Sequence, residues 1–278
     1  MRKLATSIGK PEQGCINEDA VIAREDVIAV SDGAGGGGLF AERWSEYLLK
    51  HLPATPIGSA EELDDWIGEI WEPFYNKCEA DAKQMGELSL DKFYDEGSFA
   101  TLVAVWRVSD DVCQWMSFGD STAFHYNYRT KQLEHSFGAL VDFAKPPCLI
   151  NCKDEILNEG FRKGTFHTDP DSVVFVASDA LAHYVLMMYE VAYLDRFKQE
   201  LNTAESAYSK NSNFIIMAKA KSDVNFEKDV IDKLVHIIGN PINFRRHIQS
   251  LIRKGLIAYD DYSIAMLPNK HFFDCRQL

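Results

Sequence analysis

The sequence has little of what marks a secreted, membrane-bound or nucleic-acid-binding protein. Its six cysteines are scattered through 278 residues with no Cys-x-x-Cys pair, so neither a disulfide framework nor a cysteine zinc site is predicted. No apolar run approaches the length that crosses a membrane, and the N-terminus lacks the apolar core of a signal peptide. The 29 Lys and Arg face 42 Asp and Glu, and a net charge of -13 argues against a nucleic-acid partner. We expect a cytoplasmic protein with reduced cysteines and no membrane partner.

Internal repeats, low-complexity segments and linkers are also missing, so we expect one domain over residues 1–278. A hydrophobic fraction of 46% is enough for a sizeable core. The glycine run at 35–38 lacks the Lys-Ser/Thr that completes a P-loop and the spacing of a dinucleotide fingerprint. A nucleotide site of either kind is therefore not predicted.

What the chain does contain is a recurring pattern in which acidic residues stand at the ends of short apolar strands. In the clearest case an apolar run ends at Asp32 and a glycine-rich turn follows. Hard divalent cations prefer oxygen ligands, and two such ions sharing an acid can activate water for an in-line displacement at phosphorus. Periodicity alone leaves open whether these acids converge or are turn acids in solvent. The acids at these positions are Glu18, Asp19, Asp32, Asp120, Asp179, Asp260 and Asp261.

The first half of the chain predicts strands and two helical regions. Short strands on either side of the polar turn 24–26 predict a hairpin that would bring Glu18 beside Asp32. Helical spacing is predicted over 39–52 and about 60–85, with Pro73 kinking or dividing the second region. The segments that follow predict an antiparallel meander. Those segments are 98–108, 112–118 and 122–128.

The second half is predicted to begin with an irregular long connection that contains short strands over 138–171, and to be mainly helical after a strand at 172–177. Helical stretches are expected around 181–188, 191–202, 226–238 and 242–254, before a last strand at 262–267. The segment between Asp179 and Asp260 is expected to cover the cleft and set substrate choice. His183 would either face that cleft or pack structurally.

Five motifs, in this order and spacing, resemble the metal-dependent serine/threonine protein phosphatases of type 2C, in the style of their short bacterial members. They are Asn-Glu-Asp-Ala at 17–20, Val-Ser-Asp-Gly-Ala-Gly-Gly at 30–36, Gly-Asp-Ser at 119–121, Ala-Ser-Asp-Ala at 177–180 and Asp-Asp-Tyr-Ser at 260–263. The resemblance covers essentially the whole chain. It implies an α+β fold, a four-layer α-β-β-α sandwich of two mainly antiparallel sheets flanked by helices, with two Mn²⁺ or Mg²⁺ ions at one end.

The resemblance also implies roles for the acids. Asp32 matches the acid that bridges both metals, and the carbonyl of Gly33 matches a ligand of one of them. Glu18, Asp179 and Asp260 match the remaining carboxylates of the core site, so Asp32, Asp179 and Asp260 are the expected catalytic residues.

The same resemblance implies roles outside the core metal pair for three further acids. Asp120 matches a residue that helps to hold a third, weaker metal in bacterial relatives, although it could instead be a turn acid. Asp19 and Asp261 are expected to support the metal ligands without binding metal themselves.

The implied activity is hydrolysis of phosphoserine and phosphothreonine by attack of a metal-bound hydroxide at phosphorus, without a phosphoenzyme. The implied partners are a phosphorylated protein substrate and a cognate serine/threonine kinase. Two alternatives remain open: a catalytically weak or inactive relative that serves as a binding or regulatory module, and a metal-dependent hydrolase of small phosphate esters.

Three positions depart from the family pattern. Gly14 stands where an arginine often grips the substrate phosphate, so phosphate binding must come from elsewhere. Ala34 stands where some relatives carry a histidine proposed as general acid. Ala180 follows Asp179 where glycine is usual, and a positive φ there would strain alanine.

Overall fold

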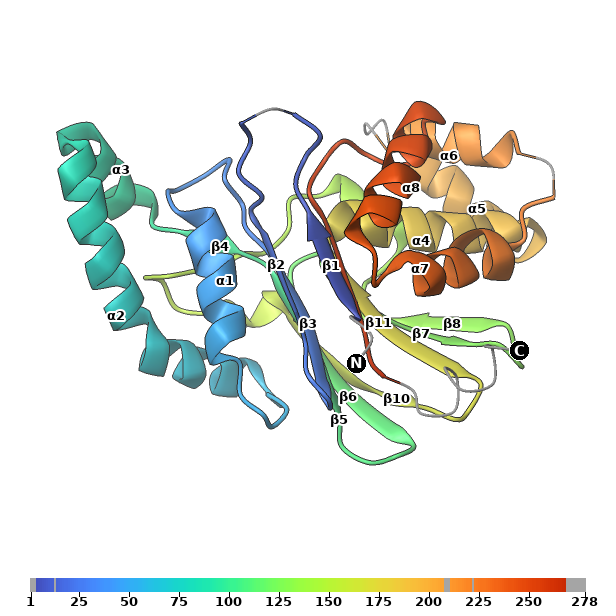
Figure 1. Cartoon of the computed structure of the whole chain (residues 1–278), viewed down its shortest axis with the longest axis horizontal. Helices are drawn as coiled ribbons and strands as arrows, with labels where there is room; N and C mark the ends of the chain where they lie inside the picture. Colours follow the sequence, from blue (N-terminus) through green and yellow to red (C-terminus); the bar gives the residue numbers. More distant parts are fainter. Residues whose placement is uncertain (1–3, 13, 208–210, 222, 269–278) are drawn as a thin grey trace.

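Two five-stranded antiparallel sheets face each other at the centre of the molecule (Figure 1). The computed structural model describes residues 4–12, 14–207, 211–221 and 223–268. The first sheet has the order β1 (Ala5–Ile8), β12 (Tyr262–Met266), β11 (Ser172–Ala177), β7 (Thr122–Asn127), β8 (Gln132–His135). The second has the order β10 (Phe161–His167), β6 (Val112–Phe118), β5 (Leu102–Arg107), β3 (Val27–Asp32), β2 (Asp19–Ala23). A separate short pair joins β4 (Phe99–Ala100) to β9 (Ile150–Asn151).

The central strands are apolar without interruption because both of their faces are buried. Ile28 and Val30 of β3 pack with Val103 of β5 and with Val174 and Val176 of β11, which forms the core between the sheets. The alternate residues of β3, Val27 and Ala29, pack outward against helices.

Helices of the first half of the chain cover the outer face of the second sheet (Figure 1). They are α1 (Ala41–His51), α2 (Ala60–Met85) and α3 (Glu87–Glu96). Pro73 does not divide α2, which continues through it, because Trp66, Phe74 and Cys78 stay buried against the core on both sides of the proline. The two predicted helical regions are confirmed, and α3 is an addition.

Helices of the second half cover the outer face of the first sheet (Figure 1). They are α4 (Asp179–Ala192), α5 (Leu194–Ser206), α6 (Ser212–Lys219), α7 (Asp232–Ile237) and α8 (Pro241–Arg253). A π-helical turn, η3 (Glu227–Ile231), precedes α7, and two 3₁₀ turns, η1 (Leu140–Ala144) and η2 (Asn158–Gly160), lie in the middle of the chain. The expected four-layer α-β-β-α sandwich is confirmed. The expectation that the segment between Asp179 and Asp260 covers the cleft is wrong, since its helices form this outer layer.

The predicted meander is correct between β5 and β6 and wrong between β6 and β7. Strands β5 and β6 pair, but β7 pairs with β11 and β8 in the other sheet. The chain therefore leaves one sheet for the other at Gly119 and Asp120, which places Asp120 at an end of the sandwich. The middle segment, expected to contain short strands at positions that the sequence did not predict, holds the seven-residue edge strand β10.

Among the described residues, no helix combines the length and the apolar character needed to cross a membrane. The five cysteines in the described part of the chain are free thiols; the sixth, Cys275, lies outside it.

Candidate active site

The β2–β3 hairpin and the ends of β11 and β12 bring the predicted acids to one end of the sandwich. Asp19 pairs directly with Asp32 across the hairpin, while the Glu18 carbonyl accepts a hydrogen bond from the Gly33 N–H at 3.1 Å. At the neighbouring strand ends, the Ser178 N–H donates to the Ser263 carbonyl at 3.1 Å. The predicted meeting of Glu18 and Asp32 is thus modified: Asp19 is the residue opposite Asp32, and Glu18 lies one step farther along.

Asp32 is fixed through its backbone by Thr101. The Thr101 N–H donates to the Asp32 carbonyl at 2.8 Å, and the Asp32 N–H donates to the Thr101 hydroxyl at 3.2 Å. Burial, reinforced by the charges of Asp19, Asp179 and Asp120, raises the pKa of Asp32 well above its ordinary value. Its carboxylate therefore lies among like charges.

Asp19 is one of two fully buried acids of the group, with 6% of its surface exposed, the other being Asp261 with 4%. Among the described residues, neither of its carboxylate oxygens has a hydrogen-bond partner of normal geometry, although the hydroxyls of Ser178 and Ser263 lie near enough to lower its pKa. Burial raises the pKa of Asp19 to about 7; the hydroxyl of Ser178 opposes this and the charge of Asp261 adds to it. An unpaired buried carboxylate costs folding free energy, and sites of this kind are candidates for function.

Glu18 is placed by Asp261 and by a glycine. The buried carboxylate of Asp261 accepts the Glu18 N–H at 2.9 Å and the Lys10 N–H at 2.7 Å. A Cβ on Gly35 would come within 1.8 Å of Glu18 Oε1, so a side chain there would displace the Glu18 carboxylate from its present position. Burial, opposed by the charge of Lys10, raises the pKa of Glu18.

Asp179 and Asp260 complete the group from the end of β11 and the start of β12. Asp179 begins α4, and its carboxylate accepts the N–H of Ala180. Burial and then the charges of Asp120, Asp260 and Asp19 raise its pKa well above the ordinary value. Asp260 forms an ion pair with Lys10, with 3.1 Å between Nζ and Oδ1. Burial alone would lower the pKa of Lys10, but the charges of Asp260, Asp261 and Glu18 raise it.

Asp120 lies where the chain passes between the sheets, beside Arg162. Burial raises its pKa to about 6, the charge of Asp260 adds to the increase, and the charge of Arg162 opposes it. Thr101 and Ser121 share a hydrogen bond of 2.7 Å, so the residue that fixes Asp32 also fixes the neighbour of Asp120.

The donor set suits a hard divalent cation, although the side chains are not arranged as a ligand shell. Within the described ranges, no three His, Cys, Asp or Glu side chains converge closely enough to hold an ion. The acids instead raise one another's pKa, and Asp19 leaves two buried oxygens unpaired. Buried oxygens with too few positive partners fit the needs of Mn²⁺ or Mg²⁺.

The departures from the family pattern have structural counterparts. Gly14 is exposed with a φ of +89°, a conformation that disfavours the arginine usual there. Ala180 lies in the first turn of α4 and is not among the described residues with positive φ, so the expected strain is wrong. The Ala34 N–H donates to the Phe99 carbonyl at 2.9 Å. His183 packs between the rings of Phe143 and Phe214, and burial lowers its pKa to about 4.

Two cationic residues at this end were missed by sequence reasoning. Lys10 lies in a loop without periodicity, and Arg162 lies on β10 inside the segment predicted to be irregular. A basic residue has no pattern of its own in a chain of 29 Lys and Arg. Only contacts between distant segments identify these two: the ion pair of Lys10 with Asp260 and the pairing of β10 with β6.

Comparison with solved structures finds the same architecture in bacterial phosphatases. The serine/threonine phosphatase PstP/Ppp of Mycobacterium tuberculosis is 16% identical, with 94% of this chain and 95% of that chain covered and a TM-score of 0.53. The catalytic domain of PstP in complex with two manganese ions is 15% identical, with 95% and 97% covered and a TM-score of 0.51. PppA of Pseudomonas aeruginosa, a key regulatory component of T6SS, is 15% identical, with 94% of both chains covered and a TM-score of 0.51.

No protein-family profile matches the sequence, and no curated protein matches it either. At 15–16% identity the likeness to solved structures establishes architecture. The chain has the fold of the bacterial serine/threonine protein phosphatases, the type 2C family that its motifs resemble.

Proposed function

We propose that this protein is a metal-dependent phosphoprotein phosphatase that hydrolyses phosphoserine and phosphothreonine. The observation that carries the proposal is the gathering of Asp19, Asp32, Asp120 and Asp179 at one end of the sandwich, where the charges of the neighbouring acids add to burial in raising the pKa of Asp32 and of Asp179. The shared fold supports it, because one structure with that fold is a phosphatase catalytic domain with two manganese ions.

In the proposed site, Asp32 would bridge two Mn²⁺ or Mg²⁺ ions, and Glu18, Asp179, Asp260 and the carbonyl of Gly33 would complete the protein ligands. Such ions lower the pKa of bound water and neutralise charge on the substrate phosphate. Four carboxylates and one carbonyl do not fill the coordination positions of two such ions, so positions remain for water and substrate.

Other residues hold this arrangement in place. Asp261 fixes the backbone of Glu18 and of Lys10, and Thr101 fixes the backbone of Asp32. Asp120 lies beyond the core acids and would hold a third, weaker ion. Supporting partners of metal ligands usually affect metal affinity or activity by about 10- to 100-fold.

A phosphorylated protein is the proposed substrate, and a serine/threonine kinase acting on the same substrate is the proposed counterpart. A deep apolar pocket is not required, because hydrolysis at phosphorus depends chiefly on ions and positioned charges.

The test is manganese-dependent turnover of a phosphoserine peptide by the wild-type chain and by Asp32→Asn. We expect the variant to lose more than about 100-fold in turnover, since it removes a ligand and not a supporting partner. Asp26→Asn is the matched control, because Asp26 is an exposed acid at the turn of the same hairpin. Full activity of Asp32→Asn would disprove the assignment.

A binding or regulatory module without turnover is the second candidate. It is favoured by Gly14, which removes the usual phosphate-gripping arginine, and by Lys10, which already pairs with Asp260. Manganese binding without turnover of any phosphopeptide, in a folded protein, would support this alternative.

A further inference from the structure

Arg162 is a cation on the mainly apolar inner face of the second sheet. It pairs across β10 and β6 with Ser117, which pairs in turn with Val103 of the core between the sheets. Directly paired residues of antiparallel strands project from the same face, so Arg162 projects between the two sheets. The next residue, Lys163, projects outward, where its Nζ donates to the Gly58 carbonyl at 2.6 Å.

The guanidinium of Arg162 enters a cavity of about 210 Å³ next to Asp120. Its lining includes Gly119, Asp120, Phe137, Lys145, Gly160 and Arg162. The guanidinium carbon lies 5.0 Å from the centre of the Phe137 ring, which holds the group by a cation–π contact.

Arg162 has hydrogen-bonding capacity that the protein does not use. In the described part of the chain, its buried Nη1 has no hydrogen-bond partner, and neither has the hydroxyl of Ser117 opposite it. Of the other charged groups in the lining, Lys145 pairs with Asp142 at 2.7 Å, and Asp120 interacts with Arg162 through its charge. A buried donor without a partner is costly unless a ligand uses it.

We propose that this cavity is an oxyanion subsite of the substrate, in which Arg162 binds a phosphate or carboxylate oxygen and supplies the positive charge that Gly14 does not. The inference rests on the proposed function for its setting, because it places the subsite beside Asp120 at the end of the sandwich where the acids gather. A planar guanidinium with free N–H groups is well suited to a phosphate or carboxylate.

The oxyanion has two possible sources, the phosphate that is hydrolysed and an acidic side chain of the peptide next to it. Both present the same oxygens to Arg162. A small substrate such as p-nitrophenyl phosphate carries only the phosphate. A phosphopeptide with acidic neighbours carries both the phosphate and a flanking carboxylate, and one with neutral neighbours carries the phosphate alone.

The experiment compares wild type, Arg162→Gln, Arg162→Lys and the control Lys163→Gln. The control removes the same charge one residue away, on the opposite face of β10. We measure the dissociation constant of inorganic phosphate by calorimetry, with Mn²⁺ and with EDTA, and KM and kcat for the three kinds of substrate. Circular dichroism and thermal unfolding establish that each variant is folded.

We expect Arg162→Gln to weaken phosphate binding and to raise KM, each about tenfold, while kcat changes less than threefold. Arg162→Lys should give values between those of Arg162→Gln and wild type. Lys163→Gln should match wild type. A KM effect on p-nitrophenyl phosphate assigns the oxyanion to the hydrolysed phosphate. An effect confined to peptides with acidic neighbours assigns it to the flanking side chain.

Unchanged phosphate binding and KM in Arg162→Gln would overturn the proposal, as would equal losses in Lys163→Gln. A fall in kcat alone would show that Arg162 only positions Asp120, and would also overturn it. If no substrate is turned over but phosphate binding still depends on Arg162, the proposed function fails and the subsite stands.

Discussion

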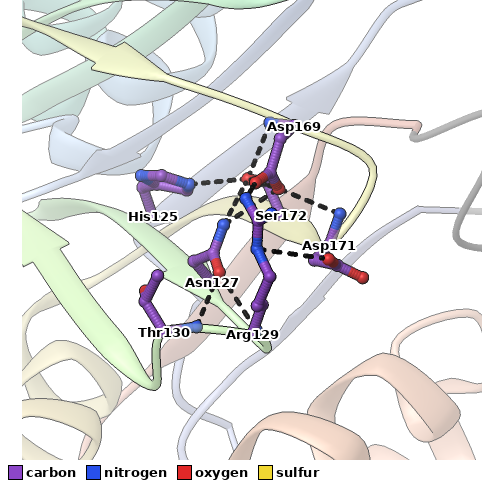
Figure 2. Close-up of polar contacts among 7 residues, drawn as sticks. All are labelled: His125, Asn127, Arg129, Thr130, Asp169, Asp171 and Ser172. Atoms are coloured by element: carbon purple, nitrogen blue, oxygen red, sulfur yellow. Dashed lines mark hydrogen bonds and ion pairs between the residues drawn. The ribbon is translucent and has the colours of Figure 1, made fainter.

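The acids at the two ends of strand β11 have opposite surroundings. Asp169, in the turn before the strand, accepts hydrogen bonds from the side chains of Asn127 at 2.9 Å and Ser172 at 3.0 Å, and from the Asp171 N–H at 2.9 Å (Figure 2). Arg129 donates to its other oxygen at 2.7 Å. Partial burial alone would raise the pKa of Asp169, but these donors lower it.

Asp179, just beyond the other end of β11, has only the N–H of Ala180 as a hydrogen-bond donor among the interactions described, and lies among acids that raise its pKa. The difference shows that an aspartate side chain stabilises the fold where hydrogen-bond donors surround it and destabilises the fold where other acids surround it. Donors built into the turn make Asp169 a structural acid, whereas the acids around Asp179 would be stabilised by the cation of the proposed site. Strand-end acids with too few donors are therefore the better candidates for chemistry.

The largest expected effect is on the pH dependence of stability in protein freed of divalent cations with EDTA. An acid whose folded pKa is raised binds protons more readily when folded, so stability is greatest below the unfolded pKa and is lost as pH rises through the folded pKa. For Asp19 the window runs from about 4 to about 7. We expect up to about 4 kcal/mol to be lost across it.

Thermal unfolding between pH 4 and 8 measures this loss. Asp19→Asn should flatten the curve because it removes the titrating group, whereas a wild-type curve that stays level or rises over the window would contradict the raised pKa. Asp120, with a pKa of about 6, contributes in the same direction.

Next in size is the contrast in turnover between the two ends of β11. Asp179→Asn should lower manganese-dependent turnover by about 100-fold or more, equivalent to about 2.7 kcal/mol, because it removes a proposed ligand. Asp169→Asn should remain within about twofold of wild type at a temperature where it is folded. Steady-state kinetics on a phosphopeptide measures both, and equal losses would show that the two ends do not differ in function.

A smaller effect is expected on stability at the structural end. Asp169→Asn should lower the free energy of unfolding by about 1–3 kcal/mol, since the amide cannot accept all four donors and leaves some unpaired. The loss should shrink as pH falls through the folded pKa of Asp169, where the wild-type carboxylate is itself protonated. Urea unfolding at neutral and acidic pH checks this, and an equally stable variant would refute the role assigned to the network.

The smallest expected effect tests a departure from the family pattern. Ala180→Gly restores the usual glycine but should lower stability by about 0.5–1 kcal/mol, because position 180 is helical and glycine is a poor helix former. Urea unfolding measures the difference. A more stable variant would show that alanine is strained there after all.

The features that sequence reasoning predicted are those with a local signal. The β2–β3 hairpin, the outlines of α1, α2 and α8, and the strands carrying Asp32 and Asp179 follow from turns and apolar periodicity. The switch of sheets at Gly119 was missed because a short link between strands does not reveal whether the next strand pairs with the last.

Sequence reasoning predicted the acids of the candidate site but not its cations. Asp32 and Asp179 end apolar strands, which is visible in sequence, whereas Lys10 and Arg162 are placed only by contacts with distant segments. The pairing of Asp19 with Asp32 depends on the exact register of the hairpin, which periodicity fixes only approximately.

Manganese binding measured by isothermal titration calorimetry is the most direct test of the proposed metal centre. Wild-type protein is predicted to bind two Mn²⁺ ions per chain, Asp32→Asn to lose at least one of them, and Asp169→Asn to bind as wild type does. Absence of manganese binding by the folded wild-type chain, or an unchanged isotherm for Asp32→Asn, would contradict the proposal that these acids hold metal.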